Sequence, residues 1–168
     1  GFRLIPTPGL FREICALADQ ARTQPRAQTD ASALQLSQKR FWKMGQGTIG
    51  TEDDVYEDAR DNGYIALGWG GTIDWSADRF SSFNAIHDEW IKQNPGNLTP
   101  SNWTQTYPFR CEMKPGDIVI VPYGNTAFRA IAEITGDYYF VPEAEGYYAH
   151  RRPVRWLLTL DEPLPLDT

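Results

Sequence analysis

The stretch KPGDIVIVPYGNTAFRAIAEI, residues 114–134, carries the clearest fold signal in the chain. Lys-Pro-Gly-Asp at 114–117 is typical of a tight turn, and the branched side chains at 118–121 favour a buried strand. Gly-Asn-Thr at 124–126 predicts a hairpin turn, and residues 128–134 alternate well enough to form the partner strand. The stretch therefore predicts a β-hairpin that contributes a buried strand to a sheet.

Further strands and helices are expected on both sides of this hairpin. Toward the C-terminus, residues 153–160 alternate as a strand with Val154, Trp156 and Leu158 on one face. The elements expected toward the N-terminus are a strand at 40–44, a helix at 52–62 between an N-cap at Thr51 and Gly63, a strand at 64–69, a helix at 81–93 and a short helix near 101–106. This order predicts an α+β fold with a curled, mixed or antiparallel sheet of five or six strands flanked by two or three helices.

The composition is that of one ordinary domain with an acidic body. The chain has 168 residues, of which 41% are hydrophobic and 23% charged, and no run is long enough for a membrane helix. Residues 1–43 hold 7 basic and 3 acidic side chains, a balance of +4, whereas residues 44–168 hold 9 basic and 19 acidic ones, a balance of −10. Phosphate neutralisation requires clustered Lys and Arg, so any nucleic-acid binding must rest on a local basic patch and specific pockets.

Catalytic and metal-binding patterns are weak. The chain has two Cys, two His and no Cys-x-x-Cys, which excludes a disulfide framework and argues against a structural zinc site. Glu112-Met113-Lys114 has the Glu-x-Lys spacing of metal-dependent nucleases, but Pro115-Gly116 follows at once, where such enzymes continue a strand. The glycine-rich residues 68–72 lack the Lys of a phosphate loop. We therefore expect no catalytic residue, no metal and no cofactor.

Aromatic residues are the unusual part of the composition. The chain has 6 Trp, 8 Tyr and 8 Phe, and six of these rings lie between residues 137 and 156. The cluster His150-Arg151-Arg152 lies in the same segment, and rings that stack a planar group beside cations that hold a phosphate are what nucleotide capture requires. The alternative is that the tyrosines cover a sheet edge while the arginines pair with nearby glutamates. Trp42 and Trp69 each end a strand before glycines, so each could project from the sheet rim or belong to the core.

Five motifs occur in an order that resembles the EVE domain, a PUA-like fold related to YTH domains. This form of the domain is often attached to McrBC-type and other modification-dependent restriction enzymes. The motifs are FWKM at 41–44, NGYIALGWG at 62–70, KPGDIVIV at 114–121, ITGDYYF at 134–140 and HRRPVRWL at 150–157. The resemblance covers residues 40–161, which leaves residues 1–39 as an N-terminal arm or linker in which a short helix can form, and residues 162–168 as a C-terminal tail.

The resemblance implies a PUA-like curled β-barrel whose rim holds a pocket for one modified base. Trp69 matches the pocket tryptophan of such domains, the rings at 138–140 and 147–148 match the loop that supplies the other walls, and Lys43 with Gly45-Gln46 matches the stretch that contacts the base edge and the backbone. With the ring and charge patterns added, the candidate pocket rings are Trp42, Trp69, Tyr138, Tyr139, Phe140, Tyr147 and Tyr148; the candidate base-edge residues are Gly45, Gln46, Asn125, Thr126 and Asp137; and the candidate phosphate-binding residues are Lys43, His150, Arg151 and Arg152.

The function that this resemblance implies is a non-catalytic reader. It would bind methylated or hydroxymethylated cytosine, or methyladenine, in DNA, with the base flipped into the aromatic pocket. It would direct an effector nuclease or motor domain in the same chain or complex, without a membrane partner, in the cytoplasm of a prokaryote. The alternatives are a modified-RNA-binding module, a metal-dependent nuclease that uses Glu112 and Lys114, and a protein-interaction domain whose positive arm docks on an acidic partner.

Overall fold

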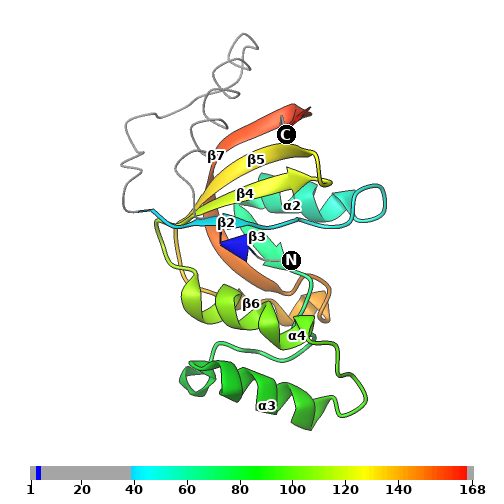
Figure 1. Ribbon diagram of the computed structural model, residues 1–168, viewed down its shortest axis with the longest axis vertical. Coiled ribbons are helices and arrows are strands. Elements are labelled where there is room, and N and C mark those ends of the chain that lie inside the picture. Colours follow the sequence, from blue (N-terminus) through cyan, green and yellow to red (C-terminus); the bar gives the residue numbers. More distant parts are fainter. Residues whose placement is uncertain (1–2, 5–38, 166–168) are drawn as a thin grey trace.

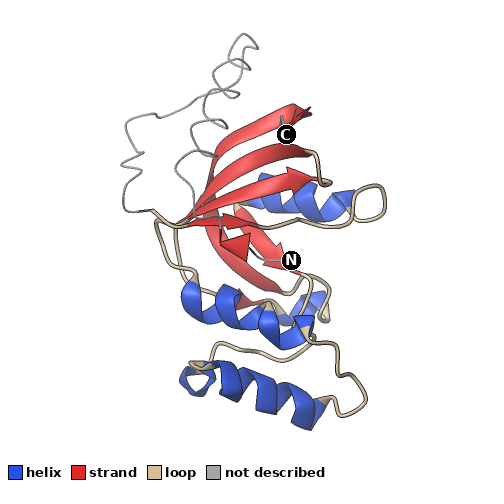
Figure 2. Ribbon diagram, in the orientation of Figure 1, coloured by secondary structure: helices blue, strands red, loops and turns tan. Residues whose placement is uncertain are grey.

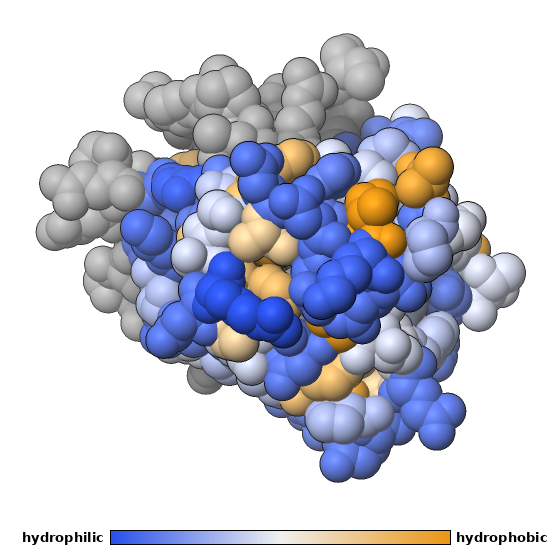
Figure 3. Space-filling model, turned by 90° about the horizontal axis from the view of Figure 1, so that it is seen from below, coloured by the Kyte–Doolittle hydropathy of each residue, from blue (hydrophilic) through white to orange (hydrophobic). Residues whose placement is uncertain are grey.

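The computed structural model describes residues 3–4 and 39–165. The helix expected in the N-terminal arm lies outside these residues, as does Cys15. Within them, no helix is both long enough and apolar enough to cross a bilayer. The face seen from below, on the side of the helix at 83–93, is mostly hydrophilic, with hydrophobic residues scattered among polar ones (Figure 3).

The described strands form one curled, mixed sheet (Figure 1). Its order is β1-β2-β4-β5-β7-β3, with β6 paired to β7; β2 and β4 run parallel, and the other pairs are antiparallel. The bounds are β1 Arg3–Leu4, β2 Phe41–Lys43, β3 Tyr64–Leu67, β4 Ile118–Tyr123, β5 Ala127–Ile134, β6 Tyr139–Phe140 and β7 His150–Pro165. The prediction of a curled mixed sheet is confirmed, and the two-residue strands β1 and β6 bring the described strands to seven, above the five or six expected.

The curl of the sheet comes from its longest strand, β7. The beginning of β7, residues 150–153, pairs with β3, and its remainder, from Val154, pairs with β5 through two register shifts. Such irregularities bend a strand and increase its twist. One strand therefore serves both sides of a half-barrel, and it extends at both ends beyond the strand expected at 153–160.

Helices cover the sheet on two sides (Figure 2). Helix α2 lies beside the strands, and the segment of α4 and η4 lies between the sheet and α3 (Figure 1). The bounds are α2 Asp53–Asn62, α3 Phe83–Gln93 and α4 Ser101–Thr104, together with the short helices η3 Asp78–Phe80, η4 Pro108–Glu112 and η5 Pro142–Ala144, of which η4 is a π-helical turn. Gly63 ends α2 in the left-handed conformation as expected, but the N-cap is Glu52 and not Thr51.

The core lies between the concave side of the sheet and these helices. It is built from β-branched strand residues and from rings outside the strands, among them Trp75 and Phe109 of η4, neither of which is exposed. Trp42 belongs to this core: its ring is 3% exposed, and its Nε1 donates to Asp117 Oδ2 at 2.9 Å. Of the two possibilities that the sequence left open for Trp42, the core ring is therefore correct. Its assignment to the pocket rings is wrong.

A buried arginine joins β7 to the helical layer. Arg152 is 2% exposed, and its guanidinium donates to the carbonyl oxygens of Phe109, Gly136 and Arg110 at 2.6, 3.1 and 3.0 Å. Burial lowers the pKa of Arg152 to about 10. The prediction that Arg152 binds phosphate is wrong, because its donors hold the η4 segment against the sheet.

A side chain connects the edge strand β3 to the chain that follows β2. Gln46 is fully buried; its Nε2 donates to Ala66 O at 3.1 Å, and its Oε1 accepts from Ala66 N at 2.8 Å. Arg129 Nη2 donates to the carbonyl oxygen of Gln46 at 2.6 Å. The amide of Gln46 thus makes the two hydrogen bonds that a neighbouring strand would make. Its assignment as a side chain that reads a base edge is corrected accordingly.

Candidate functional site

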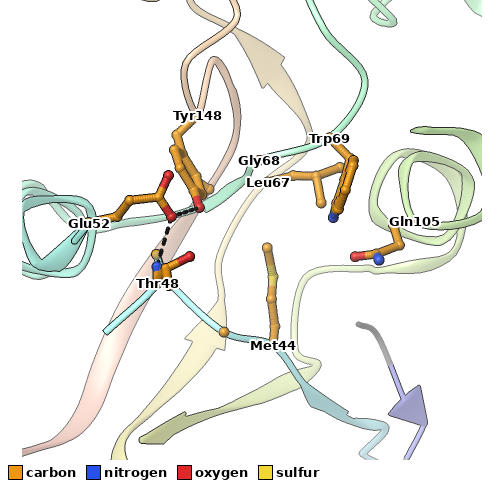
Figure 4. A pocket seen from close by; sticks show the side chains of 11 residues that line it. Met44, Thr48, Glu52, Leu67, Gly68, Trp69, Gln105 and Tyr148 are labelled. Carbon is orange, nitrogen blue, oxygen red and sulfur yellow. Dashed lines mark hydrogen bonds between the residues drawn. The ribbon is translucent and has the colours of Figure 1, made fainter. Parts of the chain in front are cut away.

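A pocket of about 430 Å³ opens beyond this junction, where β2 and β3 both end. Four segments far apart in the sequence form it: the chain between β2 and α2, the end of β3 with the loop after it, Gln105 at the end of α4, and the residue two positions before β7 (Figure 4). The lining consists of Met44, Gly45, Gly47, Thr48, Glu52, Ala66, Leu67, Gly68, Trp69, Gln105 and Tyr148. The volume lies within the range of about 300 to 1,000 Å³ that is common for small-molecule sites.

Two aromatic rings stand on opposite sides of the pocket. Trp69 follows β3 and is 38% exposed, whereas Tyr148 is half-buried and precedes β7. Figure 4 shows Leu67 and Gly68 between the two rings and Met44 pointing toward the space between them. The ring of Tyr148 lies so close to Gly68 that a Cβ there would be 3.0 Å from two ring carbons. The two rings therefore line the same pocket from opposite sides.

The loop that carries Trp69 is held in place through contacts of the next residue, Gly70. Gly70 has φ +94°, and a Cβ at this position would lie 2.9 Å from Thr106 Oγ1 and 3.0 Å from Trp75 Nε1, so only glycine fits. Trp75 Nε1 donates to Gly70 O at 3.2 Å, and Asn102 Oδ1 accepts from Gly70 N at 3.3 Å. The strict backbone requirement explains the glycine that follows this tryptophan.

His150 supports the same loop from β7. Its Nε2 donates to Gly71 O at 2.8 Å, and Tyr138 Oη donates to its Nδ1 at 2.7 Å. Burial lowers the pKa of His150 to about 4, so the ring is neutral near pH 7 with its proton on Nε2. The predictions that His150 binds phosphate and that Tyr138 lines the pocket are both wrong, because His150 is fully buried and Tyr138 is 8% exposed in the core.

The opposite wall depends on a hydrogen bond between Tyr148 and Glu52. Tyr148 Oη donates to Glu52 Oε2 at 2.9 Å, and Thr48 N donates to the same oxygen at 2.8 Å. Hydrogen bonding to Thr48, with a further contribution from Tyr148, lowers the pKa of Glu52. Tyr148 itself has φ +48°, which is uncommon for a residue with a side chain. Arg151 Nε donates to Tyr148 O at 3.1 Å and so helps to hold this backbone.

Glu52 is a lining residue that the sequence did not reveal. In the sequence it is one of three acidic residues at the start of a helix, a pattern that the helix dipole explains without any ligand. Its position depends on Gly47, where a Cβ would lie 2.1 Å from Glu52 O. This close approach and the φ of +75° at Gly47 place Glu52 at the pocket, and neither can be predicted from the sequence before the turn is folded.

The mouth of the pocket is acidic rather than basic. Glu52 occupies the N-cap of α2, Asp53 Oδ2 accepts from Gly50 N at 3.0 Å, and Asp54 lies in the same turn. Among the described residues that line the pocket, none is Lys, Arg or His. Asp53 and Asp54 in the first turn complement the positive end of the helix dipole, and their charges disfavour a phosphate there.

Three further predicted rings lie outside the lining of the pocket. Tyr139 is 38% exposed on β6, opposite Arg151 of β7, and Phe140 packs with its ring centroid 5.3 Å from that of His150. Tyr147 is 51% exposed and meets Tyr148 edge-on at 5.1 Å between ring centroids. Of the seven predicted pocket rings, the structure thus brings Trp69 and Tyr148 together at the pocket, with Tyr147 next to it.

The remaining predicted contact residues are distributed over the molecule. Asn125 and Thr126 are exposed in the turn between β4 and β5, outside the lining of the pocket, whereas Gly45 belongs to it. Lys43 is partly buried in β2, opposite Arg3. Arg151 is partly buried, and its guanidinium lies over the ring of Tyr64 at 4.1 Å from the centroid.

Asp137 lines a second hollow of about 680 Å³ on the helical side, which Arg110, Cys111 and Lys114 also line. Burial raises the pKa of the Cys111 thiol. Within the described residues, no three His, Cys, Asp or Glu side chains are grouped so that they could hold a metal ion.

The fold and the pocket define the class: an α+β domain with a curled, mixed half-barrel sheet and a ring-lined pocket at its rim. Residues 42–168 match the model of a family described as a domain of unknown function, DUF8426, and the chain belongs to that family. Comparison with curated proteins finds no match. Comparison with solved structures finds none either.

Proposed function

We propose that this chain is a PUA-like domain of the EVE type that binds one modified base of a DNA strand between Trp69 and Tyr148. The observation that carries the proposal is the pocket of about 430 Å³ at the ends of β2 and β3, with these two rings on opposite walls. The candidate bases are methylated or hydroxymethylated cytosine and methyladenine. The domain would direct an effector in the same chain or complex to modified DNA in a prokaryotic cytoplasm.

Stacking energies fit this mode of binding. Lifting a base out of a duplex costs a few kcal/mol, and stacking on aromatic side chains returns about 1 to 3 kcal/mol per base. A methyl group buried against Met44 or Leu67 adds about 0.8 kcal/mol, or roughly fourfold in affinity. The rings therefore supply most of the affinity for a base, and the modification adds a modest preference.

The proposal is tested by titrating short single strands and duplexes that carry 5-methylcytosine, 5-hydroxymethylcytosine or N6-methyladenine at one position. Fluorescence anisotropy against the unmodified strands should show tighter binding to at least one of the three. Replacing Trp69 by Ala should weaken that binding by about 1 to 3 kcal/mol, or roughly 5- to 150-fold. Phe83→Ala is the matched control, because Phe83 is 40% exposed, similar to Trp69 at 38%, and lies on α3 outside the lining of the pocket.

Equal affinity for all strands, unchanged by Trp69→Ala, would contradict the proposal. The same titration with RNA strands separates the two nucleic acids, because a requirement for the 2′-hydroxyl would assign the pocket to RNA. An equal loss of affinity in Phe83→Ala would show that the effect of Trp69→Ala is not specific to the pocket.

A further inference from the structure

We infer that the pocket selects a base with an exocyclic amino group, as in cytosine and adenine, and that the carboxylate of Glu52 makes this selection by accepting a hydrogen bond from that group. The inference rests on the proposed function and extends it from the presence of a base to its chemical class. A keto oxygen in the same position, as in thymine and uracil, would face an oxygen that cannot donate.

The carboxylate is held in place before any base binds. Tyr148 Oη and Thr48 N both donate to Oε2, and the second carboxylate oxygen, Oε1, takes part in neither of these hydrogen bonds. Tyr148 is at the same time one of the two rings that would stack the base (Figure 4). This hydrogen bond couples the acceptor to the stacking surface, and both residues line the same pocket.

The other polar side chains of the lining impose no such restriction. The amide of Gln105 and the hydroxyl of Thr48 can each donate or accept, so each fits either an amino or a keto group. The indole N–H of Trp69 donates, and every base offers ring or carbonyl acceptors to it. Among the side chains that line the pocket, only the ionised Glu52 is restricted to accepting, which makes it the residue that distinguishes the two kinds of edge.

The test compares two strands that differ in one group. With 5-methylcytosine and thymine, the ring and its methyl group are the same, and only the amino or keto group at C4 changes. We expect the protein to bind the strand with 5-methylcytosine about 10-fold more tightly, as follows from leaving a partly desolvated acceptor unpaired. Adenine and hypoxanthine form the corresponding pair for a purine.

Glu52→Gln should bring this ratio to one or below, because the amide oxygen still accepts from Tyr148 and Thr48 while the amide N–H group can donate to a keto oxygen but cannot accept from an amino group. Asp54→Asn is the matched control: it removes the same charge from the first turn of α2 but lies outside the lining. Both variants remove one negative charge and so reduce repulsion of the strand equally, but Asp54→Asn should keep the wild-type ratio.

The outcomes separate this inference from the proposed function. If Trp69→Ala weakens binding and Glu52→Gln leaves the ratio unchanged, the inference is wrong and the base pocket stands. If Trp69→Ala has no effect either, both are wrong. Tyr148→Phe provides a second variant that keeps the ring and removes its hydrogen bond to Glu52; it should lower the ratio while most of the affinity for 5-methylcytosine remains.

Discussion

At the scale of single residues, the walls of the pocket are held by buried polar side chains behind them. His150 and Tyr138 do not face the pocket, yet their hydrogen bonds join β7 to Gly71 in the loop that carries Trp69. A neutral imidazole suits this role, because one ring nitrogen donates and the other accepts. The same arrangement makes the loop sensitive to protonation of His150.

We predict that His150 makes folding stability depend on pH. Its folded-state pKa of about 4 lies below the ordinary value of 6.5, so the unfolded chain binds more protons in this interval. The contribution of His150 is fully present above pH 6.5 and is lost as the pH falls toward about 4. Between pH 7 and about pH 5 the loss is about 2 kcal/mol.

Urea unfolding of the wild type and of His150→Gln at these two pH values measures the contribution of His150 to the free energy of unfolding. The variant should lose about 2 kcal/mol less than the wild type on acidification. His87→Gln is the control, because His87 has a partly exposed side chain next to Asp88 and should keep the wild-type loss. An identical pH dependence in His150→Gln and the wild type would contradict the neutral, buried state assigned to His150.

At the scale of elements, the sequence located most strands and helices but misjudged where β7 begins. Residues 150–154 alternate between buried and partly buried side chains, which is strand periodicity, with His150, Arg152 and Val154 directed inward. The pattern of rings and cations predicted that His150, Arg151 and Arg152 bind phosphate, and side chains of these types are mostly exposed. Only the carbonyl oxygens of Phe109, Arg110 and Gly136 make the burial of Arg152 acceptable, and these lie far from it in the sequence.

We predict that the junction between the end of β2 and β3 depends on the side chain of Gln46. Gln46→Ala removes two buried hydrogen bonds and leaves the N–H and C=O of Ala66 without these partners. The expected loss is about 2 to 3 kcal/mol in the free energy of unfolding. Gln93→Ala, which changes an exposed glutamine of α3, should alter stability by no more than about 0.5 kcal/mol. Equal effects of the two substitutions in urea unfolding would show that Gln46 does not join these segments.

At the scale of the whole molecule, charge limits how a nucleic acid can bind. The chain carries a net charge of −6, and the mouth of the pocket carries carboxylates at the start of α2. Two of the four predicted phosphate-binding residues, His150 and Arg152, are buried, which leaves Lys43 and Arg151. The pocket itself must therefore provide most of the binding energy in the proposed function.

We predict a weak dependence of this binding on salt. Each phosphate that the protein neutralises on a single strand contributes about −0.7 to the slope of log affinity against log salt concentration. With Lys43 and Arg151 as the only two phosphate contacts of the proposed site, the slope should be no steeper than about −1.5. Titrations of the preferred modified strand between about 50 and 300 mM salt measure it. A slope near −4 or steeper would show that more phosphates are neutralised than Lys43 and Arg151 can contact.

The sequence by itself determined most of the elements and the α+β class with a curled sheet. The turn at 114–117, the branched residues at 118–121 and the glycine that ends α2 act through local conformational preferences, so they are readable in one dimension. It also singled out Trp69 and Tyr148. Only the tertiary structure decided which rings line one pocket, that Trp42, Tyr138 and Arg152 are interior, and that Glu52 forms part of a wall. The physical reason is that burial and partnership depend on residues distant in the chain, such as Glu52 and Tyr148, which are 96 positions apart.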